Sequence, residues 1–205
     1  MEKVTIFKNF NMPIEDVTLS SIISNIKTGT YYDSINAIRM AKGMGKPERA
    51  DQLKKELLAF TPSATFKDGR KKELLTAYSG CVHLDFDKLT PEELQQAFDL
   101  AVKIPFTYAC FTSPSGDGLK VFIKVNTDHE THEQAYKQVQ TYYEKEISIE
   151  ADPKCKDITR LCFVSDDTNA FLNESASTFK ITLQEQAPLS EPLFEQAQNS
   201  VNTVF

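Results

Sequence analysis

Two segments near the middle of the chain carry an aliphatic or aromatic residue at every second position. They are residues 81–87 (CVHLDFD) and residues 119–125 (LKVFIKV). Because successive side chains of a β-strand point to opposite faces, each segment predicts a strand with one apolar and one polar face. The apolar faces would be formed by Val82, Leu84 and Phe86 in the first strand, and by Leu119, Val121, Ile123 and Val125 in the second.

Helical spacing separates these strands. A helix is predicted at 91–102, because Thr90 and Glu93 have the spacing of a capping box and Pro91 occupies the first helical position. The remaining expected elements are a strand at 106–112, a turn at 114–118, a helix at 130–146 and a last strand at 160–165. This β-α-β-β-α-β order predicts an α+β fold of the RNA-recognition-motif or ferredoxin-like type. In such a fold both helices cover one face of an antiparallel sheet, and we expect the other face to be free.

The pattern divides the chain into three regions. Residues 1–79 predict a mainly helical extension packed on the core, with a strand at 4–7 and helical spacing at 14–26, 34–41 and 46–58. Residues 80–186 hold the core with its C-terminal strands. From residue 187 to residue 205 the chain has no Lys or Arg and is rich in Gln, Ser, Asn and Pro, which predicts a tail or linker.

Composition narrows the class of protein. The 205 residues are 40% hydrophobic and 25% charged, as is typical of a globular domain and not of a disordered chain. No run approaches the ~18 apolar residues of a membrane helix and the start is no signal peptide, so we expect a cytoplasmic protein with no membrane partner. The net charge of −6 disfavours duplex binding over the whole surface, and leaves a local basic surface or bound metal ions as routes to nucleic acid.

The four cysteines have irregular spacings and are expected to be reduced and mostly buried. A zinc site made by Cys155 and Cys162 with His129 and His132 is a less favoured alternative, because the spacing fits no common zinc motif. A cluster of basic residues precedes the core. We expect it to be a solvated loop, with a phosphate-facing edge of a site as the alternative. Its members are Lys67, Arg70, Lys71 and Lys72.

The polar faces of the two alternating strands carry the candidate chemistry. Asp85 and Asp87 lie on one face with Cα atoms ~6.5–7 Å apart, and two carboxylates this close repel each other unless a cation lies between them. Carboxylate oxygens favour Mg²⁺ or Mn²⁺, which assist phosphoryl and nucleotidyl transfer. Lys120 and Phe122 lie on the polar face of the second strand, so they are expected to share this surface with His83.

Two loops complete the candidate site. Residues 113–118 (SPSGDG) precede Lys120, and their glycines allow backbone N–H groups to approach an anion, although a simple hairpin turn explains them equally well. The spacing is not that of a Walker A loop. In the second loop Asp152 or Asp157 is a candidate third carboxylate and Arg160 a candidate phosphate ligand, with a polar loop of ordinary ion pairs as the alternative.

Three segments together resemble a known family. Residues 80–87 (GCVHLDFD), 113–120 (SPSGDGLK) and 152–167 (DPKCKDITRLCFVSDD) resemble the VirE N-terminal-domain family, with a weaker similarity at 57–66 (LLAFTPSATF). The resemblance covers about the central half of the chain. That family is associated with bacterial mobile elements and often precedes a helicase-like domain. Its core is similar to the archaeo-eukaryotic primase, or primase-polymerase, superfamily.

The resemblance implies a primase-polymerase-like nucleotidyltransferase in the replication of a mobile element. It would bind a nucleoside triphosphate with Mg²⁺ or Mn²⁺, act on single-stranded DNA or RNA, and work with a helicase-like domain C-terminal to this chain. Lys120 stands where such enzymes carry a His, which leaves polymerising activity open, as is the choice of ribo- or deoxyribonucleotides. The implied metal ligands are Asp85, Asp87 and Asp152, with Asp157 second to Asp152; the implied catalytic residues are Asp85, Asp87 and Lys120; the implied nucleotide-binding residues are Ser115, Gly116, Gly118, Lys120, Arg160 and Ser165.

Three alternatives remain. The first is a catalytically inactive nucleic-acid-binding module, in which Phe122 and His83 contact bases on the free sheet face. A lone Phe on a sheet face is more often covered by other parts of the chain than exposed, and a covered Phe122 would weaken this alternative. The second, a rolling-circle nicking enzyme, is disfavoured because Tyr142 and Tyr143 fit a helix core and the His pair of such enzymes is incomplete. The third is a remnant without a ligand, for which metal would not change stability.

Overall fold

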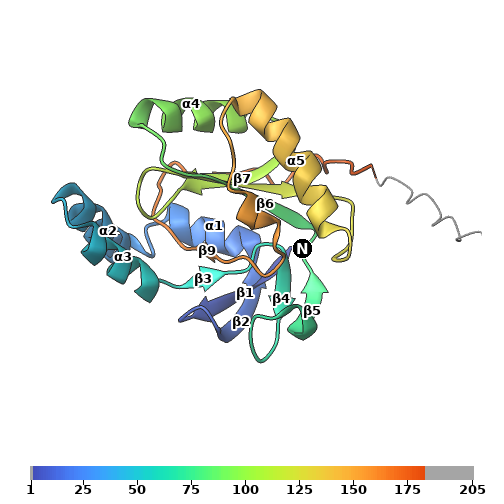
Figure 1. The fold of residues 1–205 in the computed structure, drawn as a ribbon, viewed down its shortest axis with the longest axis horizontal. Helices are drawn as coiled ribbons and strands as arrows, with labels where there is room; N and C mark the ends of the chain where they lie inside the picture. Colours follow the sequence, from blue (N-terminus) through green and yellow to red (C-terminus); the bar gives the residue numbers. More distant parts are fainter. Residues whose placement is uncertain (1, 183–205) are drawn as a thin grey trace, which may run out of the picture.

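The core of the molecule is an antiparallel sheet with two helices on one face. In the computed structural model, which describes residues 2–182, the strand order is β10-β7-β8-β6. Helices α4 and α5 lie together on one side of this sheet (Figure 1). The order β6-α4-β7-β8-α5 confirms the expected α+β fold. The bounds are β6 (Cys81–Phe86), α4 (Pro91–Ala101), β7 (Thr107–Thr112), β8 (Leu119–Lys124), α5 (His132–Ile147) and β10 (Phe171–Leu172).

The apolar alternation of β6 and β8 faces the two helices, as predicted. Val82, Leu84 and Phe86 are fully buried in one cluster with the apolar residues of β8, α4 and α5. The predicted capping box is present: the Thr90 side chain accepts the Glu93 N–H, and the Glu93 carboxylate accepts the Thr90 N–H at 2.8 Å. These local signals therefore position the sheet and its helical layer.

The opposite face of the sheet is covered, so the expectation of a free face was wrong. Helix α1 (Leu19–Lys27) and a second sheet pack against it, and Phe122 and Phe111 are fully buried among Ile22, Ile23 and Val4. The second sheet has the order β2-β1-β3-β9. Its strands are β1 (Lys3–Lys8), β2 (Met12–Thr18), β3 (Ala59–Phe60) and β9 (Cys162–Phe163).

The N-terminal extension contains more strand than expected. The helix expected at 14–26 begins only at Leu19, because residues 12–18 pair antiparallel with β1 and Thr18 caps α1 by accepting the Ser21 N–H. Helices α2 (Tyr32–Gly43) and α3 (Pro47–Glu56) confirm the two later helices, and they project together to one side of the molecule (Figure 1). A two-stranded sheet follows, made by β4 (Ala64–Phe66) and β5 (Leu75–Tyr78).

The last predicted strand lies in a different sheet. β9 pairs with β3 of the second sheet, while β10 completes the core sheet at the β7 edge. The chain from 152 to 163 therefore crosses from the core sheet to the second sheet. The predicted tail at 187–205 lies outside the described residues. No helix within 2–182 is long and apolar enough to cross a membrane.

A buried histidine joins α5 to β5. His132 is 2% exposed, its Nδ1 lies 2.9 Å from the Tyr78 hydroxyl, and burial lowers the pKa of His132 to about 4. Asp157 and Glu133 act to raise this pKa, and Lys72 acts to lower it.

Protein stability should therefore decrease in acid. Since the unfolded histidine has a pKa near 6.5, the unfolded state binds more protons below that pH. The contribution of His132 to the free energy of unfolding should fall by up to about 1.4 kcal/mol per pH unit from pH ~6.5 towards pH ~4, and the buried His83, whose pKa burial also lowers, adds to the total. Urea unfolding at several pH values across this range should show that the free energy of unfolding depends less steeply on pH in His132→Gln than in the wild type. The slope should be unchanged in His129→Gln, because His129 is exposed. An unchanged slope in His132→Gln would contradict this assignment.

Candidate functional site

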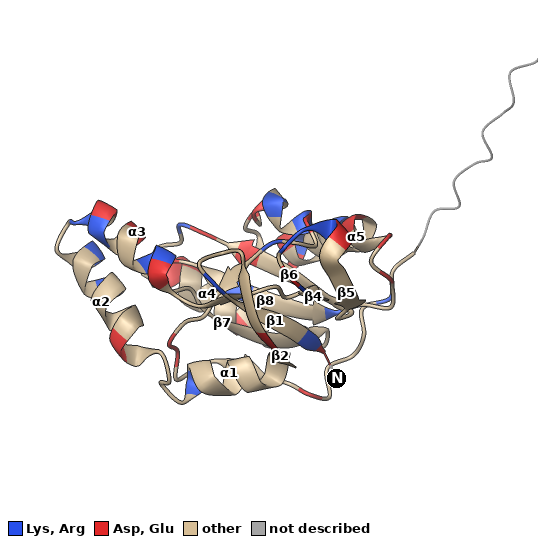
Figure 2. Cartoon of the chain, turned by 90° about the horizontal axis from the view of Figure 1, so that it is seen from below, with Lys and Arg blue, Asp and Glu red and all other residues tan. Residues whose placement is uncertain are grey.

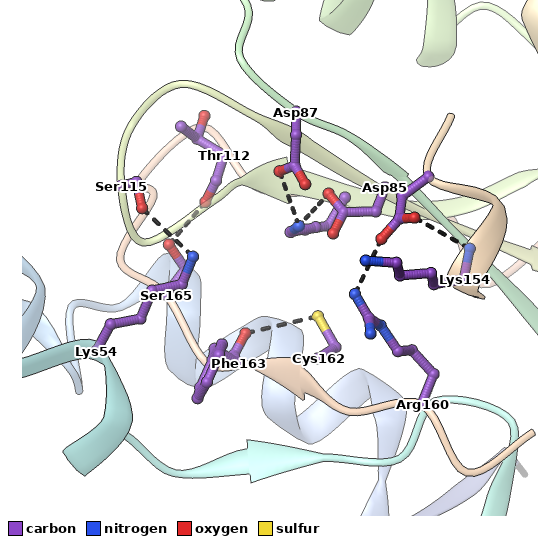
Figure 3. A network of polar contacts seen from close by, with 12 residues as sticks. Lys54, Asp85, Asp87, Thr112, Ser115, Lys154, Arg160, Cys162, Phe163 and Ser165 are labelled. Atoms are coloured by element: carbon purple, nitrogen blue, oxygen red, sulfur yellow. Dashed lines mark hydrogen bonds and ion pairs between the residues drawn. The ribbon is translucent and has the colours of Figure 1, made fainter. Parts of the chain in front are cut away.

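A cavity of about 280 Å³ lies where the end of the core sheet meets β9 of the second sheet. Residues from the two sheets, from α3 and from the connecting loops converge on it (Figure 3). Its charged lining consists of Lys54, Arg70, Asp85, Asp87, Lys120 and Arg160. Its apolar lining consists of Phe10, Pro114, Leu161, Cys162 and Phe163.

Two carboxylates, Asp85 and Asp87, line this cavity, and a third, Asp152, lies beside them. Asp85 is near the end of β6 and is 6% exposed, while Asp87 follows the strand and is exposed. Asp152 joins them because its backbone N–H donates to the Asp85 carbonyl at 2.8 Å. Carboxylate oxygens of the three residues lie within 4.8 Å of one another. Asp157, the alternative third acid, is exposed, accepts the Thr159 N–H at 2.9 Å and is not in this group.

Each of these carboxylates has a cationic partner. The Lys120 ammonium contacts Asp85 and lies 3.4 Å from Oδ1 of Asp87, and Nη2 of Arg160 lies 2.9 Å from Oδ2 of Asp152. Two unit negative charges 4.8 Å apart repel by about 3–4 kcal/mol at an effective dielectric constant of ~20, so the cations are needed to hold the carboxylates together. Burial alone would lower the pKa of Lys120, but Asp85, with Asp87, raises it above its ordinary value.

Lys54 and Arg70 line the same cavity. Lys54, on α3, lies with its Nζ 3.4 Å from the Ser115 hydroxyl. The Nε of Arg70 donates to the Phe10 carbonyl at 2.9 Å. Arg70 thus lines this cavity, whereas the other three members of the basic cluster are exposed, as expected of a solvated loop, and do not line it. Sequence reasoning missed Lys54, because nothing in its helix distinguishes it from other surface lysines.

The cationic side chains at the cavity are a local feature of a chain whose net charge is negative. In Figure 2, basic and acidic residues are interspersed on α3 and around α5. This distribution agrees with the net charge of −6. Four cationic side chains line the cavity, and affinity for an anion is expected to depend on them.

The loop at 113–118 is held tightly against the acids. A Cβ added at Gly118 would lie 2.8 Å from the Phe86 carbonyl oxygen and 2.9 Å from Oδ1 of Asp87, so this position requires glycine. The Gly116 N–H donates to the Ser113 carbonyl at 2.9 Å. Because that amide is used inside the turn, it is not free to cradle a phosphate as expected. Arg39 holds the loop further by donating to two of its carbonyls.

Ser165, His83 and Phe122 are buried and do not face a ligand. Ser165 is fully buried and its hydroxyl donates to the Thr112 carbonyl at 2.6 Å, so it does not line the cavity. His83 is also buried and stacks on Phe122 with ring centroids 5.1 Å apart. These two rings are therefore covered and do not present a surface for bases. Ser115 is partly exposed at the loop and contacts Lys54.

The alternative zinc site is not assembled. All four cysteines are buried and free, as expected. Among residues 2–182, the group that contains Cys155 joins it to His83 and Asp85, and no group of three candidate ligands combines either Cys155 or Cys162 with His129 or His132. Burial raises the pKa of the Cys155 thiol to about 12, so without a metal this side chain is an uncharged core residue.

One family of known proteins matches the chain. The model of the BT4734-like, N-terminal domain family matches residues 52–172, more than half of the chain. No curated protein and no solved structure matches the chain. The matched segment begins in α3, ends in β10, and includes every charged residue that lines the cavity. The chain belongs to the BT4734-like, N-terminal domain family.

Proposed function

We propose that this domain is a primase-polymerase-like nucleotidyltransferase that binds a metal–nucleoside triphosphate and extends a strand on single-stranded nucleic acid. One observation carries the proposal: three carboxylates within 4.8 Å of one another lie beside a cavity lined by four cationic side chains. The resemblance of three sequence segments to the VirE N-terminal-domain and primase families supports it. That resemblance also suggests a role in replication of a mobile element beside a helicase-like domain.

The donor set suits a hard divalent cation. Asp85, Asp87 and Asp152 offer carboxylate oxygens, which Mg²⁺ and Mn²⁺ favour. When bound, such an ion neutralises phosphate charge and polarises the phosphoryl group that is transferred. The chain's own residues fit this arrangement, because the exposed Asp87 leaves the carboxylate group accessible from the cavity.

The cations would hold the triphosphate. Lys120 and Arg160 lie directly beside the carboxylates, while Lys54 and Arg70 extend the positive lining. In the transfer, the 3′-hydroxyl oxygen of the strand bonds to the α-phosphorus, the bond between the α- and β-phosphates breaks, and pyrophosphate leaves with the electron pair. The hydroxyl proton passes to solvent water, since Asp87, the exposed carboxylate, serves as a metal ligand in this arrangement. Cations placed beforehand stabilise the developing charge.

Thermal unfolding with Mn²⁺ and a nucleoside triphosphate, separately and together, tests this function. We expect a joint stabilisation of about 2.7 kcal/mol at a hundredfold ligand excess over the dissociation constant. The effect should disappear in Asp85→Asn/Asp87→Asn and persist in Asp117→Asn, whose carboxylate pairs with Lys42 at 2.6 Å in the adjacent loop. Primer extension on single-stranded DNA should follow the same pattern. No joint stabilisation of the wild type would exclude the proposal for this domain.

A catalytically inactive nucleic-acid-binding module is the second candidate. One observation favours it: Lys120 and Arg160 already compensate the three carboxylates without a metal. Because His83 and Phe122 are buried, such a module would use the charged rim of the cavity instead of a stacking face. It predicts binding of single-stranded oligonucleotides that EDTA leaves unchanged, and no strand synthesis.

A further inference from the structure

The hairpin that joins β1 and β2 holds an aromatic residue in an unfavourable backbone conformation. Asn9 and Phe10 have φ angles of 53° and 65°, both in the left-handed region. Asn tolerates this region because of its short polar side chain, whereas a bulky residue there is an outlier. Strained residues of this kind are found most often at ligand sites, where the surrounding structure maintains them.

Packing of the core does not account for Phe10. Its side chain is partly exposed and belongs to none of the four apolar clusters within residues 2–182. Its ring instead meets Phe163 edge to face, with centroids 5.7 Å apart and planes at 81°. Its backbone carbonyl accepts the Arg70 Nε, which keeps the tip of the hairpin at the cavity.

The cavity consequently has two chemically different walls. Phe10, Phe163 and Leu161 form an apolar, partly aromatic wall on the side of the second sheet. Across from Phe163 lie Asp85 and Asp87 (Figure 3), and the Lys120 ammonium contacts both carboxylates. Lys54 also lines the cavity, with its Nζ 3.4 Å from the Ser115 hydroxyl and 5.6 Å from the centre of the Phe163 ring. A ligand that matches both walls has a flat apolar end and an anionic end.

We propose that Phe10 and Phe163 form the subsite for a nucleobase, with the phosphates of the same nucleotide directed to Lys120 and Arg160. This inference rests on the proposed function, because it assigns a subsite within the same cavity. Every base has an aromatic face, so stacking on these rings accepts any base and does not select a sequence. Phe10 lies outside the segment 52–172 that the family model matches, so the N-terminal hairpin contributes this part of the subsite.

The test compares a ligand with a base and one without. Equilibrium binding of ATP and of inorganic tripolyphosphate, each with Mn²⁺, is measured for wild type, Phe10→Gly, Phe163→Leu and Asn9→Gly. Phe10→Gly should weaken ATP binding by about fivefold to a hundredfold, the range expected for loss of one stacked base, and leave tripolyphosphate binding within about twofold. Its melting temperature should equal or exceed that of the wild type, because glycine fits the left-handed region.

The controls separate the base from the fold. Asn9→Gly changes the same turn without touching the cavity lining and should bind both ligands as the wild type does. Phe163→Leu should show the selective loss of ATP affinity as well, and Phe10→Tyr should restore it. Unchanged ATP affinity in Phe10→Gly, or an equal loss for both ligands, would overturn the subsite while leaving the proposed function standing. A wild-type protein that binds neither ATP nor tripolyphosphate would reject the proposed function and the subsite together.

A third ligand distinguishes the incoming nucleotide from the template. A single-stranded oligonucleotide without a triphosphate should bind Phe10→Gly and wild type with similar affinity. Loss of oligonucleotide binding with ATP binding intact would overturn the assignment, because the aromatic pair would then hold a template base.

Discussion

Replacing Lys120 by methionine should lower the free energy of unfolding by about 3–5 kcal/mol at neutral pH in EDTA, the usual cost of removing one partner of a buried ion pair. Lys120 is 7% exposed and contacts Asp85, which is 6% exposed, so the variant leaves a buried carboxylate without its counter-ion. Asp87 and Asp152 lie within 4.8 Å and add to the repulsion. Urea unfolding measures the loss directly.

The same variant reports on metal binding. With Lys120 removed, Mn²⁺ alone should restore much of the lost stability, whereas in the wild type the ammonium already occupies the position between Asp85 and Asp87. Lys42→Met is the matched control, because it removes an exposed ion pair with Asp117 and should cost less than about 1 kcal/mol.

A double variant controls for misfolding of Lys120→Met. The double variant Asp85→Asn/Lys120→Met removes both charges and should be more stable than Lys120→Met alone. A Lys120→Met protein as stable in EDTA as the wild type would show that the ion pair does not hold the carboxylates together. Destabilisation without recovery in Mn²⁺ would remove support for a metal site at Asp85 and Asp87.

Asp152→Asn should reduce metal-dependent strand synthesis by roughly a hundredfold or more, because the loss of a metal ligand removes several kcal/mol of transition-state stabilisation. The joint stabilisation by Mn²⁺ and nucleotide should disappear with it. Asp152 is the acid whose carboxylate lies with Asp85 and Asp87. Primer extension and thermal unfolding on the same samples measure the two effects.

Asp157→Asn is the matched control variant. Asp157 is five positions further on, is exposed, and accepts hydrogen bonds from Thr159 instead of joining the acidic group. Its activity should stay within about twofold of the wild type, since surface changes of this kind usually have small effects. Activity lost in Asp157→Asn and retained in Asp152→Asn would reverse the assignment of the third acid.

Local sequence signals were sufficient for the elements of the core. The alternation in β6 and β8 predicted which side chains face the helices, because strand geometry fixes that alternation residue by residue. The capping box at Thr90 and Glu93 likewise depends only on neighbours three residues apart. Asp85, Asp87 and Lys120 could be placed on one surface for the same reason, as their positions follow from the pleat of two paired strands.

Longer-range packing overturned other expectations. The alternation shows that β6 has a polar face, but not that α1 and a second sheet cover that face, since this depends on segments distant in sequence. Ser165 was expected in the pocket because of its place in a motif, yet its hydroxyl donates to the Thr112 backbone carbonyl. Lys54 and Phe10 carried no local signal for a site, because each reaches the cavity only through the packing of its own helix or hairpin.

The sequence by itself determined the elements of the α+β core and placed Asp85, Asp87 and Lys120 on the polar faces of their strands, since both follow from periodicities within single strands and helices. Only the tertiary structure decided that Asp152 and not Asp157 completes the acidic group, because one backbone hydrogen bond to Asp85 selects between them. The tertiary structure also decided that β9 leaves the core sheet for the second one. That pairing brings Arg160 and Phe163 to the same cavity as Asp85 and Asp87.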